Sequence, residues 1–195
     1  MAEQGKVACL LGDGFEESEL RVPCDRLMRA GYKVDIIGAK AGEELKGKKG
    51  EEVVKADLSI ADVRPEEYRA LLIPGGYSPD HLRADDRFVD FVRRFNALKR
   101  PLAAVCHGPQ LLMTAGLVHG RTLTAWKTIQ TDLKLMGARV LDEPVVISGW
   151  WITSRMPDDL DAFSAAVVNA LDTGMQGSLD TVAADRPLES IADRA

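Results

Sequence analysis

The sequence has few histidines and few cysteines, and both shortages limit the chemistry that it can support. Its three cysteines are an odd number and stand far apart, which does not indicate a disulfide framework. The three histidines are His81, His107 and His119, and the sequence contains neither a CxxC nor an HExxH motif. We therefore expect no zinc site.

Long apolar runs and long basic runs are also missing. No stretch approaches the roughly 20 apolar residues that span a membrane, and the N-terminus has no apolar signal core. The net charge is −5, and we interpret the single basic cluster, 46–49, as a solvated loop. These features predict a cytoplasmic protein that neither enters a membrane nor forms a stable complex with nucleic acid.

What the sequence does contain is an alternation of apolar strands and amphipathic helices. Short apolar runs predict buried strands at 6–11, 32–38, 70–73 and 102–105, and a hairpin is expected at 145–154. Helices are predicted at about 15–30, 85–98, 109–115, 127–136 and 158–171. This order predicts an α/β fold, a doubly wound and mostly parallel sheet with helices on both faces. The chain fits a single domain, expected over 1–173, and an acidic, flexible tail at 174–195.

The segment 101–113 organises the rest of the chain. Its apolar strand ends at Val105, and Gly108 and Pro109 begin a helix, so Cys106 lies on the turn between the two elements. Small residues stand two positions before and two after the cysteine, as in a nucleophile elbow, where a tight turn holds the nucleophile above the sheet edge. A helix N-terminus beneath the sulfur would lower the pKa of the thiol. Cys106 is therefore our candidate nucleophile.

Two further motifs are expected at the same edge of the sheet. Glu16 and Glu19 are three residues apart at the start of the first helix, so they share a face that meets the carboxyl ends of the strands, where ligands bind in such folds. Stabilisation of the helix dipole explains acids there equally well. Gly75 and Gly76 directly follow a strand, where their backbone N–H groups can form an oxyanion site or merely a turn.

A cysteine nucleophile needs a base or a lowered pKa, and the base is not obvious in this sequence. No histidine follows His119, so the late-chain histidine that glutamine amidotransferases use is missing. His107 adjoins the cysteine, but adjacent residues on such a turn rarely point at one another. An acid from elsewhere, such as Asp80 of a second subunit, could orient this histidine.

Three segments, taken in this order, resemble the PfpI family: FEESEL at 15–20, IPGGYSPD at 73–80 and AVCHGPQ at 104–110. This family is a branch of the superfamily that includes the Parkinson-linked deglycase, and the YhbO-like bacterial general stress proteins are the most similar group. The resemblance spans about 6–171. It implies a flavodoxin-like sandwich that forms a homodimer or a larger homo-oligomer.

The resemblance also implies roles for single residues. Cys106 would be the nucleophile with His107 beside it, and Glu19 would contact the sulfur, with Glu16 one turn earlier. The backbone of Gly75, Gly76 and His107 would bind an oxyanion. Asp80 stands where some relatives have a glutamate that orients the histidine across a subunit interface, and its side chain is one methylene shorter.

Three functions remain open at this point. In the first, Cys106 attacks a small carbonyl such as methylglyoxal, or its adduct on a protein or nucleotide, Glu19 shuttles the proton, and no cofactor is needed. In the second, Cys106 and His107 cleave peptide bonds as an intracellular peptidase. In the third, Cys106 is an oxidisable thiol of a redox-sensing or chaperone-like stress protein. We favour the first, because the sequence shows neither a firm triad nor an extended cleft.

Overall fold

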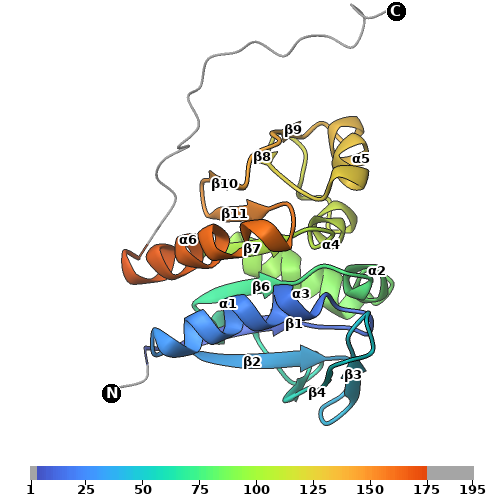
Figure 1. The fold of residues 1–195 in the computed structure, drawn as a ribbon, viewed down its shortest axis with the longest axis vertical. Coiled ribbons are helices and arrows are strands. Elements are labelled where there is room, and N and C mark those ends of the chain that lie inside the picture. The colour runs from blue at the N-terminus through green and yellow to red at the C-terminus, as the bar shows by residue number, and fades with distance from the viewer. Residues whose placement is uncertain (1–3, 175–195) are drawn as a thin grey trace, which may run out of the picture.

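A computed structural model of the protein describes residues 4–174, and its centre is a seven-stranded sheet. The strands of this sheet are β1 (Lys6–Leu10), β2 (Lys33–Gly38), β5 (Leu58–Ser59), β6 (Ala70–Ile73), β7 (Leu102–Val105), β10 (Val145–Ser148) and β11 (Trp151–Ser154). Their spatial order is β10-β11-β7-β6-β1-β2-β5, and within it β10 runs antiparallel to β11 while the other neighbours are parallel (Figure 1). The parallel strands β2-β1-β6-β7-β11 thus follow the flavodoxin-like order 2-1-3-4-5.

Six α-helices surround the sheet: α1 (Glu17–Arg29), α2 (Ser78–Leu82), α3 (Asp86–Ala97), α4 (Pro109–Thr114), α5 (Gln130–Leu135) and α6 (Leu160–Asp172). Single 3-10 turns lie at Pro65–Glu67, Lys127–Ile129 and Pro157–Asp159. Two small sheets complete the described part of the chain: β3 (Glu44–Lys46) pairs with β4 (Val53–Lys55), and β8 (Thr122–Leu123) pairs with β9 (Arg139–Val140). No helix within residues 4–174 is long and apolar enough to cross a membrane.

The helices form two layers because successive residues of a strand point to opposite faces of the sheet. On β1, Val7 and Cys9 pack in one core with α1 and α6, whereas Ala8 and Leu10 pack in a second core with α3 and α4. Figure 1 shows α1 and α6 lying side by side across the first of these faces. The predicted fold class, a doubly wound sheet between two helical layers, is therefore confirmed.

One side-chain oxygen ties both tryptophans of the β10–β11 hairpin to α3. Asn96 on α3 accepts hydrogen bonds from the indole nitrogens of Trp150 (2.9 Å) and Trp151 (2.8 Å). The guanidinium of Arg121 lies 4.3 Å from the centre of the Trp150 ring, within the range of a cation–π contact. These contacts anchor the β10–β11 hairpin, whose second strand pairs with β7.

Most sequence-based boundaries differ from the structure by one or two residues, and two helices differ in kind at their start. The helix predicted at 127–136 is a 3-10 turn followed by the six-residue α5, and the predicted final helix begins at Leu160 after a 3-10 turn. Apart from Gly174, the predicted tail at 174–195 lies outside the described residues.

Candidate active site

Cys106 occupies the predicted turn at the end of β7, and the backbone there is strained. Its φ angle is +59°, in the left-handed region that residues with a Cβ seldom adopt. Its N–H donates to Ser154 O and its carbonyl accepts from the Trp126 N–H, both at 3.0 Å. A Cβ at Gly108 would lie 2.5 Å from the Ile73 carbonyl oxygen, so the turn requires glycine there. The cysteine is thus held in a nucleophile elbow by its neighbours on both sides.

Glu19 lies beside this thiol and is completely buried. Its Oε2 accepts a hydrogen bond of 2.9 Å from the Gly75 N–H. Burial raises the pKa of Glu19 to about 7, although its interactions with the Cys106 thiol and with Gly75 act in the opposite direction. A carboxyl with such a pKa gives up and takes back a proton easily at neutral pH, as a general acid–base requires.

The thiol of Cys106 does not have the lowered pKa that we expected from the helix N-terminus, and this prediction was wrong. Burial raises the pKa of Cys106 well above its usual range, and the negative charge of Glu19 adds to the effect. Helix α4 has only six residues, and the N–H groups of Gly76 and His107 lower the pKa only in part. When Glu19 takes up a proton, however, its charge disappears and it can donate to the sulfur. The two groups therefore act as a pair that shares one proton.

The two glycines after β6 have different parts in the site. The Gly75 N–H already donates to Glu19, so it is not the free oxyanion donor that we expected, and an added Cβ would lie 2.8 Å from the Cys106 Cβ. Gly76 has a φ of +72°, and a Cβ there would lie 2.4 Å from the Gly14 carbonyl oxygen. Its N–H and that of His107 stabilise negative charge at the sulfur. The expectation that these two N–H groups bind an oxyanion stays a prediction.

His107 points at the thiol, although adjacent residues on such a turn were not expected to do so. Its Nδ1 lies 3.3 Å from Cys106 Sγ, and its Nε2 lies 3.4 Å from the hydroxyl of Thr128. The Trp126 ring covers it at 6.3 Å between ring centres. Burial and the charge of Lys48 lower the pKa of His107, which favours the neutral imidazole. Thr128 was missed because no motif marks a hydroxyl 21 residues away.

Asp80 does not reach His107 within this chain. It lies on α2 with a side chain that is 60% exposed, and it forms an ion pair with Arg83 at 2.7 Å. The proposal that Asp80 orients the histidine of a second subunit therefore stays a prediction.

Glu16 is buried at the same edge, where it binds two lysines. Lys48 forms an ion pair with Glu16 Oε2, and the Lys49 ammonium lies 3.3 Å from Oε1. Burial raises the pKa of Glu16, but the two lysines outweigh it, and the net pKa is lowered. The side chains of Lys48 and Lys49 are 36% and 54% exposed, as expected of a solvated loop at 46–49, but both also form ion pairs with Glu16. Sequence reasoning missed them because 32 positions separate Glu16 from Lys48.

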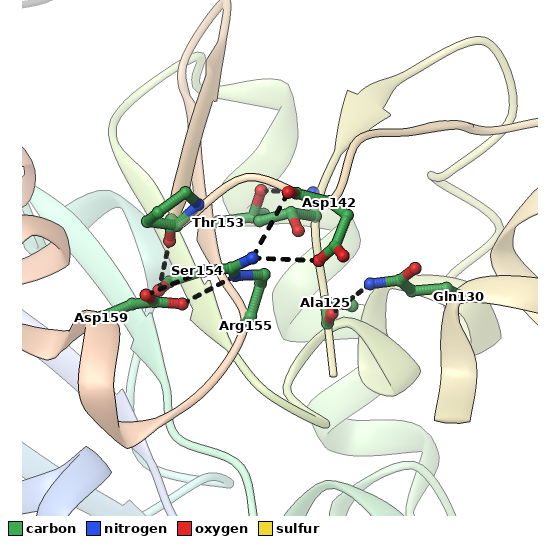
Figure 2. Close-up of polar contacts among 9 residues, drawn as sticks. Ala125, Gln130, Asp142, Thr153, Ser154, Arg155 and Asp159 are labelled. Atoms are coloured by element: carbon green, nitrogen blue, oxygen red, sulfur yellow. Dashed lines mark hydrogen bonds and ion pairs between the residues drawn. The ribbon is translucent and has the colours of Figure 1, made fainter. Parts of the chain in front are cut away.

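Figure 2 shows the polar contacts of the residues that follow β11, next to the turn at Cys106. Arg155 directly follows Ser154, the residue that binds the Cys106 N–H. Its guanidinium donates to both oxygens of Asp159 (2.9 and 3.2 Å) and to Asp142 Oδ1 (3.1 Å). Gln130 donates to the Ala125 carbonyl at 3.1 Å. The Gln130 bond closes the segment 125–130, which carries Trp126 and Thr128.

The model of the DJ-1/PfpI family matches residues 5–170. The chain belongs to this family. A DJ-1/PfpI relative from Escherichia coli strain K12, named protein/nucleic acid deglycase 2, is 48% identical over 167 residues, which cover 85% of this chain and 97% of the relative. An uncharacterized protein of Staphylococcus haemolyticus is 47% identical over 168 residues, with 85% of this chain and 97% of the relative covered.

Solved DJ-1/PfpI structures have the same fold. A two-domain protein from Anabaena variabilis, with DJ-1/ThiJ/PfpI-like and ferritin-like domains, superimposes with a TM-score of 0.85 at 38% identity over 86% of this chain. The chain spans 48% of the length of that two-domain protein. Drosophila melanogaster DJ-1beta superimposes with a TM-score of 0.77 at 25% identity, over 90% of this chain and 99% of its own.

Proposed function

We propose that the protein is a cysteine-dependent enzyme of reactive carbonyls, a glutathione-independent glyoxalase that also removes glyoxal adducts from proteins or nucleotides. The observation that carries this proposal is the fully buried Glu19, with a pKa of about 7, beside the thiol of Cys106. The name of the E. coli relative, protein/nucleic acid deglycase 2, supports it. Its partners are a small carbonyl or a glycated protein or nucleotide, and no cofactor takes part in the steps below.

The reaction begins with the proton of the Cys106–Glu19 pair on the carboxyl. The thiolate adds to the aldehyde carbon of methylglyoxal, and the new oxyanion, bound by the N–H groups of Gly76 and His107, takes the proton of Glu19. The Glu19 carboxylate then removes the hydrogen from this carbon and delivers it to the neighbouring ketone carbon. The hydroxyl proton passes from the first oxygen to the second. This leaves a thioester of lactate on Cys106.

Water then cleaves the carbon–sulfur bond of the thioester and releases lactate, one proton and the free thiol. The aldehyde carbon has been oxidised and the ketone carbon reduced. The overall reaction converts methylglyoxal and water into lactate and one proton, so no external oxidant is needed. On an adduct of methylglyoxal with an amine, attack by the sulfur breaks the carbon–nitrogen bond. The amine leaves with a proton, and the remaining fragment follows the same route.

A second candidate is a cysteine peptidase, and the contact of 3.3 Å between Cys106 Sγ and His107 Nδ1 favours it. In this reading the histidine needs an acid behind it, which would be Asp80 of a second subunit in a homodimer. Thr128 is a weaker substitute, because a hydroxyl does not stabilise an imidazolium by charge. The redox reading has less support, since Cys106 is only 7% exposed and the pKa of its thiol is raised.

The deciding experiment measures lactate formed from methylglyoxal, without glutathione or added metal, by the reduced wild-type protein and by its variants. We expect turnover by the wild type, none by Cys106→Ser, and a loss of at least a hundredfold in Glu19→Gln. Folded, reduced wild-type protein that forms no lactate would overturn the proposal. In that case, cleavage of unstructured peptides by wild type and His107→Ala would test the second candidate.

A further inference from the structure

The loop between β3 and β4 is fastened to the start of α1, and this fixes the position of Lys48. The Lys48 N–H donates to the Phe15 carbonyl at 2.8 Å, and the Lys49 N–H donates to Glu17 Oε1 at 2.9 Å. Gly47 forms a bridge with Phe15 and packs against the Glu17 side chain, which would have to shift for an added Cβ, since that atom would lie 2.3 Å from Glu17 Oε1. The backbone of Lys48 is thus held by the same turn that carries Glu16.

The side chain of Lys48 connects a buried carboxylate with solvent. Its side chain is 36% exposed, whereas that of Glu16, its ion-pair partner, is 4% exposed. Glu16 keeps a second cation, Lys49, on its other oxygen. An ammonium has three N–H donors, and one of them serves Glu16. Lys48 can therefore bind a second anion while Glu16 remains paired.

Lys48 lies next to the site: Phe15, which accepts its backbone N–H, forms a bridge with Gly76, and its partner Glu16 stands one turn before Glu19. The charge of Lys48 lowers the pKa of both Glu19 and His107, and the negative form of Cys106 raises the pKa of Lys48 in return. The oxyanion at the reacting carbon is served by backbone N–H groups, as described above. Lys48 is thus a partly exposed cation beside the thiol site, available for a negative group of the substrate or of its product.

We propose that Lys48 is an anion-binding specificity residue, which binds a carboxylate or phosphate group of the substrate or product beside Cys106. This inference rests on the proposed function, because it assumes that the carbonyl substrate is processed at Cys106. It predicts that anionic carbonyl compounds and adducts, such as those on nucleotides, are preferred over neutral ones of the same shape. A bound carboxylate would also retain the product, lactate.

The test measures binding of lactate, lactamide and inorganic phosphate to the reduced protein by calorimetry or NMR titration, so it does not depend on turnover. Lactate and lactamide have nearly the same shape and differ in charge. We expect the wild type to bind lactate at least tenfold more tightly than lactamide. Lys48→Met should lose at least tenfold in lactate affinity, Lys48→Arg should retain it within about threefold, and the neighbouring Lys49→Met should match the wild type.

Each outcome has a definite meaning. If neither lactate nor phosphate binds more weakly to Lys48→Met than to the wild type, the proposal is overturned. If phosphate binds in a Lys48-dependent way and lactate does not, the anion is a phosphate, and the proposal stands in that form. Lactate binding without turnover of methylglyoxal would refute the proposed function and leave the anion site intact. Turnover without binding of either anion would refute the anion site alone.

Discussion

Replacement of Glu19 by glutamine should stabilise the fold at neutral and alkaline pH while it abolishes catalysis. Burial raises the pKa of this carboxyl from 4.5 to about 7 in the folded protein. Between these values the native state binds more protons than the unfolded state, so the free energy of unfolding falls as the pH rises and levels off above pH 7. At about 1.4 kcal/mol per pH unit, ionisation of Glu19 costs the folded protein about 3 kcal/mol. Glutamine keeps an oxygen for the Gly75 N–H and avoids this cost.

The assay is urea unfolding at pH 5 and pH 8, under reducing conditions, for the wild type and Glu19→Gln. Between the two pH values the wild type should lose about 2.5 kcal/mol more stability than the variant, because a small part of the cost is already present at pH 5. Glu16→Gln is the matched control, because it should change the free energy of unfolding in the opposite direction. The pKa of Glu16 is lowered by Lys48 and Lys49, so the variant should lose stability relative to the wild type at both pH values. If wild type and Glu19→Gln lose the same stability between pH 5 and 8, burial does not raise the pKa of the Glu19 carboxyl. The proposal that this carboxyl shuttles a proton near neutral pH then fails.

Three further predictions concern neighbouring positions. Gly76→Ala places a Cβ against the Gly14 carbonyl at positive φ, so it should lower the free energy of unfolding by about 2 kcal/mol or more in urea titrations, and an unchanged stability would contradict this geometry. Thr128→Val removes the hydroxyl from His107 Nε2, so kcat should fall about threefold to tenfold with a shifted pH–rate profile; an unaltered profile would show that this contact does not position the histidine. Asp80→Asn should leave methylglyoxal turnover unchanged, and a loss above about tenfold in the assembled protein would indicate that the acid acts across a subunit interface.

The fold was largely predictable because the apolar strands are short, uninterrupted and separated by helices. The runs at 70–73 and 102–105 are strands β6 and β7 with the predicted bounds, and the turn at Cys106 follows from the small residues around it. The segment 127–136 was less predictable. It lacks a strong helix-capping signal, and a local side-chain bond from Gln130 to the Ala125 carbonyl lies at its start.

The site was only partly predictable for a different reason. Local sequence places a nucleophile on a turn and two acids on a helix face, but it does not show what a loop 32 residues away contributes. Lys48 and Thr128 reach the site through tertiary contacts that leave no pattern in the sequence. The sequence also did not predict the direction in which the pKa of Cys106 is shifted. The expected effect of a helix N-terminus on Cys106 was outweighed by burial and by Glu19, and the extent of burial depends on the whole packed edge.

The arrangement of the tryptophans gives the protein its own optical reporter. Trp150 and Trp151 are tied to one oxygen of Asn96 at the outer edge of the sheet, whereas Trp126 lies 6.3 Å from the ring of His107. Emission from the first two reports whether the hairpin is intact, and emission from the third responds to events around the histidine. Subtracting the spectrum of a Trp126→Phe variant from that of the wild type isolates the second signal. Substrate arrival and imidazole protonation can then be followed in real time by fluorescence, without any attached dye.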